Sequence, residues 1–65
     1  MREAIAMFKL NVVVFPASSN VYDSLAEAYM EDGQKDLSIT NYEKSLALDP
    51  DNANAVEMLR QLEEQ

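Results

Sequence analysis

The chain has 65 residues, of which 48% are apolar, and carries twelve acidic against five basic side chains, for a formal net charge of −7. Its length leaves room for one small domain, and the lack of cysteine and histidine excludes disulfides, the usual zinc ligands and Ser-His-Asp or Cys-His catalysis. The acid excess and the scattered bases disfavour nucleic acid and membrane surfaces as partners, and the longest apolar run, residues 12–17, is too short to cross a bilayer.

Two prolines and one glycine divide the chain into four segments of helical length. Pro16 follows the first segment, Gly33 terminates the second as a left-handed helix ending, and Pro50 closes the third. The predicted helices are residues 1–15, 21–32, 34–48 and 53–65. The connections between them are short, which is typical of antiparallel neighbours in helical hairpins.

The first segment combines helical spacing with a strand-prone end. Ile5, Phe8 and Val12 recur at the steps of a helix, whereas residues 12–15 alone would suit a strand. A single strand would have nothing to pair with, so we predict a helix. Because residues 12–15 cannot all face one neighbour, we expect Met1, Ile5 and part of this run to lie where an upstream helix would pack. We expect an isolated chain to cover this surface as a homo-oligomer or swapped dimer, and a longer parent protein to cover it with a preceding domain.

The other segments show the same amphipathic spacing, with apolar side chains three and four residues apart. In residues 21–32, acidic side chains follow at four-residue steps on a second face, and Ser19 and Asn20 precede them as candidate caps. Six larger side chains at these spacings are predicted to form the core: Tyr22, Leu25, Tyr29, Tyr42, Leu46 and Leu59.

A shift of 34 residues superimposes the chain on itself. The shift places Ile5 on Ile39 and Pro16 on Pro50, and the polar and apolar order is kept through a helix end and the following helix start. Further matched pairs are Phe8 with Tyr42, Val12 with Leu46, Asn20 with Asn54 and Leu25 with Leu59. A period of this size predicts stacked helix-turn-helix units.

Residues 19–52 resemble one complete tetratricopeptide repeat. The residues that carry this resemblance are Tyr22, Leu25, Ala26, Tyr29, Gly33, Tyr42, Leu46, Leu48, Asp49 and Pro50. Ser38 and Ser45 stand where the family usually has alanine. The resemblance implies an all-α fold of four helices in antiparallel helix-turn-helix repeats, an α-solenoid. Residues 1–16 would be the second helix of a preceding repeat, and residues 53–65 the first helix of a following repeat or a capping helix.

The phase of the match also leads to an expectation about the parent protein. The chain begins and ends half-way through a repeat, so we expect an excised C-terminal piece of a longer protein. Stretches such as N-V-Y-D-S-L-A-E-A-Y also look like short repeat tails behind bacterial serine-hydrolase and β-lactamase-like domains. The catalytic motifs of those enzymes do not occur in this sequence. The sequence leaves the cellular compartment open.

The resemblance also implies a binding surface, because the first helix of each repeat lines a concave groove in this family. The positions that match are Asn20, Asp23, Ser24, Glu27, Met30 and Glu31, followed by Asn54, Glu57, Met58 and Gln61. Most are acidic or neutral, so a bound protein or peptide is expected to be neutral or basic, with apolar anchors on Met30 and Met58. The competing interpretation is an acidic face that is only solvated.

Two other groups of polar residues resemble functional sites but are predicted to be structural. Asp49, Asp51 and Asn52 faintly suggest a calcium loop, but the loop's glycine and glutamate are absent, so we predict a helix stop followed by a cap. Ser24, Lys35 and Asp36 offer a hydroxyl, an amine and a carboxylate without Ser-x-x-Lys spacing or a glycine-rich oxyanion loop. We therefore predict neither catalysis nor a metal or cofactor.

Three functions remain open from the sequence. The leading hypothesis is a non-enzymatic protein–protein interaction module of the tetratricopeptide type. The alternative is a structural or regulatory tail of a larger bacterial hydrolase whose catalytic residues lie outside this chain. A third interpretation is an engineered or truncated fragment without any ligand.

Overall fold

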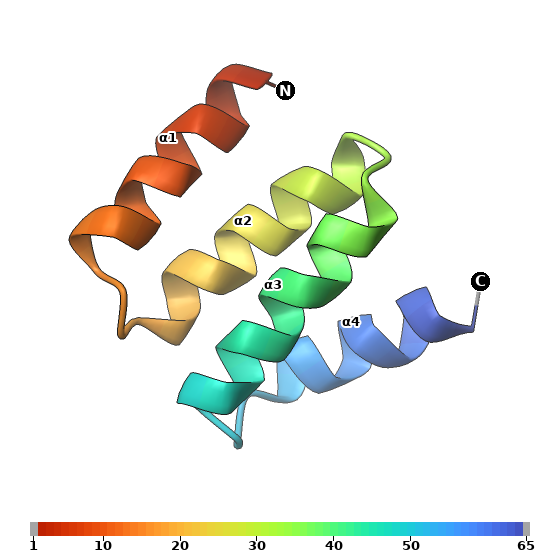
Figure 1. The fold of residues 1–65 in the computed structure, drawn as a ribbon. Helices are drawn as coiled ribbons and strands as arrows, with labels where there is room; N and C mark the ends of the chain where they lie inside the picture. Colours follow the sequence, from red (N-terminus) through yellow and green to blue (C-terminus); the bar gives the residue numbers. More distant parts are fainter. Residues whose placement is uncertain (1, 65) are drawn as a thin grey trace.

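The computed structural model describes residues 2–64, which form four α-helices (Figure 1). They are α1 (Arg2–Val14), α2 (Ser19–Glu31), α3 (Lys35–Leu48) and α4 (Ala53–Glu63). Within the described residues every regular element is a helix, which confirms the predicted all-α fold. The strand-prone end of the first segment is helical up to Val14.

The observed helix boundaries differ by a few residues from the predicted ones, because local turns set where each helix begins. Ser18 donates its backbone N–H to the Phe15 carbonyl at 3.1 Å, closing a turn around Pro16, and α2 begins directly afterwards. The N-cap is therefore Ser18, which has an extended backbone and makes no side-chain cap hydrogen bond. The prediction that Ser19 or Asn20 caps this helix is wrong, because both already lie in its first turn. Met1 and Gln65, the ends of the predicted outer helices, lie outside the described residues.

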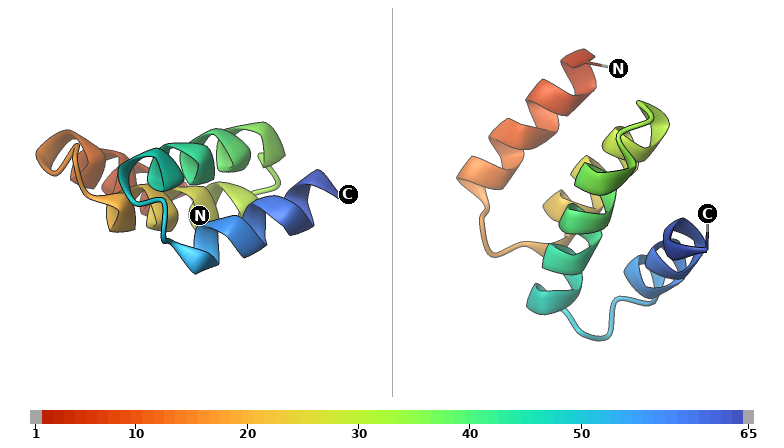
Figure 2. Two further views of the ribbon diagram at one scale, coloured as in Figure 1. Left: turned by 90° about the horizontal axis from the view of Figure 1, so that it is seen from below. Right: turned by 45° about the vertical axis from the view of Figure 1, so that its right-hand side comes forward.

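The hairpin of α2 and α3 forms the centre of the molecule, with α1 and α4 on opposite sides of it (Figure 1). Each helix packs against the next one along the chain: α1 on α2, α2 on α3, and α3 on α4. Seen from below, α4 lies on the same side of α3 as α2 does (Figure 2). The Cα atoms span 29 × 25 × 13 Å, so the helices form a thin slab in which every helix keeps one face open to solvent.

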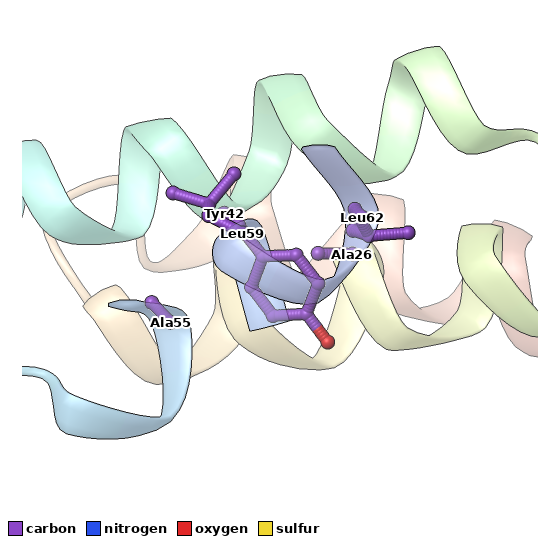
Figure 3. Packing of buried hydrophobic residues seen from close by; sticks show 5 residues of the cluster. All are labelled: Ala26, Tyr42, Ala55, Leu59 and Leu62. Atoms are coloured by element: carbon purple, nitrogen blue, oxygen red, sulfur yellow. The ribbon is translucent and has the colours of Figure 1, made fainter. Parts of the chain in front are cut away.

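Buried side chains form two clusters, one at each end of the slab. The C-terminal cluster consists of Ala26, Tyr42, Ala55, Leu59 and Leu62 (Figure 3). Four half-buried side chains pack against it, namely Met30, Ile39, Leu46 and Met58. The N-terminal cluster consists of Ile5, Leu25, Ala28 and Tyr29, with Phe8 and Val12 packed against it. Together the two clusters draw on all four helices.

Four of the six predicted core residues are buried, namely Leu25, Tyr29, Tyr42 and Leu59. Leu46 and Tyr22 are half-buried, and Leu46 packs against the C-terminal cluster. The placement predicted for Ile5 is wrong. Ile5 is only 7% exposed and packs toward α2 in the N-terminal cluster, because helical rotation carries it to the same face as Phe8 and Val12.

Two buried serines hold α3 close to α2. Ser38 and Ser45 have no exposed surface, and their hydroxyls donate to the backbone carbonyls of Ala26 at 2.8 Å and Ser19 at 3.0 Å. Their small size allows the two helix backbones to approach, and the hydrogen bonds satisfy polar groups that would otherwise be costly to bury. Serine at these positions thus keeps the close packing that alanine would give.

Candidate functional site

The residues predicted to line a groove occupy α2 and α4 but differ in accessibility. Those that are exposed are Asn20, Glu27, Glu31, Asn54, Glu57 and Gln61. Those that are half-buried are Asp23, Ser24, Met30 and Met58. The predicted surface therefore combines solvent-facing polar side chains with a half-buried set, in which Asp23 and Ser24 are polar and Met30 and Met58 are apolar.

Met30 and Met58 both pack against the C-terminal cluster. Their thioethers therefore contribute to the packing between helices and retain only part of their surface for a partner. Methionine adapts its shape to a contacting surface at low cost, so this remaining surface is a suitable apolar contact. Contact between a partner and this methionine surface stays a prediction.

Asp23 is held in a polar network at the junction of three helices. Asn52 donates its side-chain N–H groups to Asp23 Oδ2 and to Ser45 Oγ, both at 2.9 Å. Asn52 Oδ1 accepts from the backbone N–H of Ala55 at 3.1 Å and so caps α4. Oδ1 of Asp23 is buried without a hydrogen-bond partner among the described residues. Asp23 is thus a structural carboxylate that connects α2 to the start of α4.

Asn52 was not among the predicted site residues, although its position after Pro50 indicated a helix cap. The structure confirms the helix stop and cap predicted for residues 49–52. The backbone N–H of Asp51 donates to Asp49 Oδ1 at 3.1 Å, which closes the turn before the Asn52 cap. What the sequence did not indicate was the reach of the Asn52 amide to Asp23, 29 positions earlier in the chain.

Glu57 also has a local partner. Arg60 Nε donates to Glu57 Oε2 at 3.1 Å, and Arg60 bonds Glu64 at 3.3 Å one turn later. The hydrogen bonds from Arg60 and then Gln61 hold the pKa of the Glu57 carboxyl below its usual range. All these groups are exposed, so the pair is weak and a partner can displace it.

Three carboxylates of α2 create a negative field over the C-terminal cluster. Burial, and after it the negative charges of Glu27, Asp23 and Glu31, together raise the pKa of the Tyr42 hydroxyl to about 12. The ion pairs found among the described residues join Arg60 to Glu57 and Glu64, so Glu27 and Glu31 take part in neither. A cation near these two glutamates would meet favourable charge without displacing a salt bridge.

A hollow of about 250 Å³ lies between α1 and α2, which we call the α1–α2 hollow. Its lining consists of Ala4, Phe8, Ser24, Glu27, Ala28 and Glu31. It therefore gathers three of the predicted groove residues, but joins them to two side chains of α1 that sequence reasoning did not select. Its apolar floor and acidic border suit a ligand that is both apolar and basic.

Metal-ligating groups and membrane-spanning helices were both sought among the described residues. Residues 2–64 contain no group of three or more metal-ligating side chains, and none of the four helices has the length and apolar character needed to cross a bilayer. Ser24, the hydroxyl considered for catalysis, is part of the α1–α2 hollow.

No protein-family model, curated protein or solved structure matches this chain.

Proposed function

We propose that this chain is a non-enzymatic protein interaction module of the tetratricopeptide type that binds a neutral or basic segment of a partner. The internal period of 34 residues and the sequence of antiparallel helical hairpins support the family. The observation that carries the binding function is the row of carboxylates along α2, Asp23, Glu27 and Glu31, at four-residue steps, whose negative charges act on the Tyr42 hydroxyl. Two half-buried methionines, Met30 and Met58, pack against the same cluster as Tyr42.

The charges favour a basic partner over an acidic one. The chain carries a net charge of −7, and the ion pairs found among the described residues leave out Glu27 and Glu31, the exposed carboxylates of α2. Complementary charge speeds association and selects against partners of the same sign. The apolar contacts with the methionines would supply affinity that is independent of salt.

The test is a titration with two labelled extended peptides of equal length, one rich in lysine and one rich in glutamate, followed by fluorescence anisotropy. We expect only the basic peptide to bind, and the double variant Glu27→Lys and Glu57→Lys to weaken binding by about tenfold or more. The matched control is Glu43→Lys with Glu63→Lys, which changes the net charge equally at exposed positions outside the predicted groove. Stronger binding of the acidic peptide, or equal loss in both double variants, would contradict the proposal.

A further inference from the structure

The two buried clusters are copies of each other under the 34-residue shift. Five of the six members of the N-terminal cluster have a counterpart in the C-terminal cluster: Ile5 and Ile39, Phe8 and Tyr42, Val12 and Leu46, Leu25 and Leu59, Ala28 and Leu62. The sixth, Tyr29, falls on the exposed Glu63. The packing of α1 on α2 therefore repeats the packing of α3 on α4. The repeat seen in the sequence is also a repeat of contacts.

The main difference between the two clusters is a third helix. The C-terminal cluster receives Ala26 and Met30 from α2 in addition to the side chains of α3 and α4. The N-terminal cluster contains residues of α1 and α2 alone within the described chain. As a result Tyr42 is 1% exposed, whereas its counterpart Phe8 is only half-buried.

The α1–α2 hollow lies where this third helix would pack. Four of its lining residues, Ala4, Phe8, Ser24 and Ala28, correspond under the shift to Ser38, Tyr42, Met58 and Leu62. In the C-terminal copy, Ser38 donates its hydroxyl to the Ala26 carbonyl, while Tyr42 and Leu62 pack with Ala26. The space that is hollow at one end is thus filled by α2 at the other.

The border of the hollow is more acidic than its counterpart. Glu27 and Glu31 line it, and the shift places these two residues on Gln61 and Gln65. On α1, Met7 and Leu10 are 57% and 61% exposed, although their counterparts on α3 are polar. The counterpart of Leu10 is Lys44, whose Nζ lies 5.9 Å from the ring centroid of Tyr22 on α2, so this position contacts the neighbouring helix.

We propose that the α1–α2 hollow binds a basic amphipathic helix of a partner protein, which takes the place that α2 has in the C-terminal cluster. This helix presents a small residue where α2 has Ala26 and a larger apolar residue where α2 has Met30, four positions later. Its lysine or arginine side chains pair with Glu27 and Glu31. The proposal deepens the interaction function proposed above by specifying a helix and its position.

A second copy of this chain fits the hollow poorly. The repeat-equivalent helix it could offer is α4, where the shift puts Arg60 at the position of Ala26 and Glu64 at that of Met30. A large charged side chain at the point of closest approach would keep the helices apart. Two chains that each carry a charge of −7 would also repel one another.

The probe for this proposal is a synthetic peptide with the sequence of residues 19–31 and the changes Asp23→Lys and Glu27→Lys, which we call the basic α2 peptide. A covalent link between positions 24 and 28, on the side opposite Ala26, keeps it helical. We expect saturable binding to the full chain, with NMR shift changes at Ala4 and Ala28. One control peptide keeps Asp23 and Glu27, and another carries Ala26→Trp; both are expected to bind weakly.

Variants of the full chain provide the matched comparison. Ala4→Phe fills the hollow, and Glu27→Gln with Glu31→Gln removes its charge; each is expected to weaken binding by about tenfold. The controls are Ala47→Phe on the exposed surface of α3 and Glu43→Gln with Glu63→Gln, which should change affinity by less than about twofold. Circular dichroism checks that every variant keeps its helices.

The outcomes separate this inference from the function on which it rests. If Ala4→Phe leaves binding unchanged and the NMR shift changes occur at Met58 and Gln61 instead, the helix site is overturned and the acidic groove remains. Binding in the hollow while extended basic peptides fail would support the helix site and contradict the groove. No binding by any basic peptide would overturn both. Self-association that Ala4→Phe abolishes would assign the hollow to a second copy and overturn the proposed partner.

Discussion

Tyr42 shows how much a single side chain can depend on its surroundings in a domain this small. Its ring lies among Ala26, Leu59 and Leu62 (Figure 3). The negative charges of the α2 carboxylates act on its hydroxyl. Burial and negative charge both penalise the phenolate, so the pKa rises from 10.0 to about 12. The folded state therefore keeps the Tyr42 proton over a pH range in which the unfolded chain loses it.

This difference predicts a loss of stability at alkaline pH. Below pH 10 both states hold the proton, and between pH 10 and 12 only the folded state does, so the free energy of unfolding should fall by about 1.4 kcal/mol per pH unit. Urea unfolding followed by circular dichroism at several pH values measures the slope. Tyr42→Phe removes the ionisable group and should flatten the slope, since Tyr22 and Tyr29 remain in both proteins. Equal slopes in both proteins would contradict this account.

At the scale of single elements, backbone hydrogen bonds at Gly33 and Gln34 define the end of α2. Gly33 has a φ of +79°, donates its backbone N–H to the Met30 carbonyl, and is followed by Gln34, which donates to the Tyr29 carbonyl at 2.9 Å. This pair of bonds is the Schellman ending of a helix, and it favours glycine because a Cβ strains the left-handed backbone. The ending turns the chain back so that α3 can return along α2.

Gly33→Ala should therefore lower the free energy of unfolding by about 1 kcal/mol. A Cβ at this position would have no atom within 4 Å, so the effect comes from the backbone alone and not from a clash. Gly33→Asn should cost less, because asparagine tolerates the left-handed region. Asp32→Ala, at an exposed neighbour with negative φ, is the control and should cost no more than about 0.5 kcal/mol. Urea midpoints of the three variants test the order, and a loss for Asp32→Ala as large as for Gly33→Ala would refute it.

At the scale of the whole molecule, a polar junction attaches α4 to the central hairpin. Asn52 caps α4 and bonds Asp23 of α2 and Ser45 of α3, and the Ser45 hydroxyl in turn bonds the first residue of α2. Few apolar contacts are available to a slab this thin, so these hydrogen bonds specify how α4 lies against the hairpin of α2 and α3. The junction is local in space but spans most of a repeat in sequence.

Asn52→Ala should destabilise the protein by about 2 to 4 kcal/mol, because it removes a helix cap and leaves the half-buried Asp23 carboxylate without a donor. Asn54→Ala, two residues into the same helix and exposed, is the matched control and should be nearly neutral. Asn52→Asp keeps the capping oxygen but places a second carboxylate next to Asp23. It should therefore also lower the stability of the protein at neutral pH, and part of that stability should return in acid. Chemical denaturation at pH 7 and pH 4 measures both effects, and similar stabilities for the Asn52→Ala and Asn54→Ala variants would argue against the junction.

The sequence by itself determined the elements: four helices, their turns at Pro16, Gly33 and Pro50, and most of the buried stripe, including Leu25, Tyr29 and Tyr42. Spacing and turn residues are local properties, so the sequence expresses them directly. Tertiary structure decided which helix faces meet. Three features depend on helix rotation and crossing: the burial of Ile5 against α2, the hydrogen bond from Asn52 to Asp23, and the hollow between α1 and α2. Contacts between distant parts of a chain fix those quantities, and no single segment of the sequence contains them.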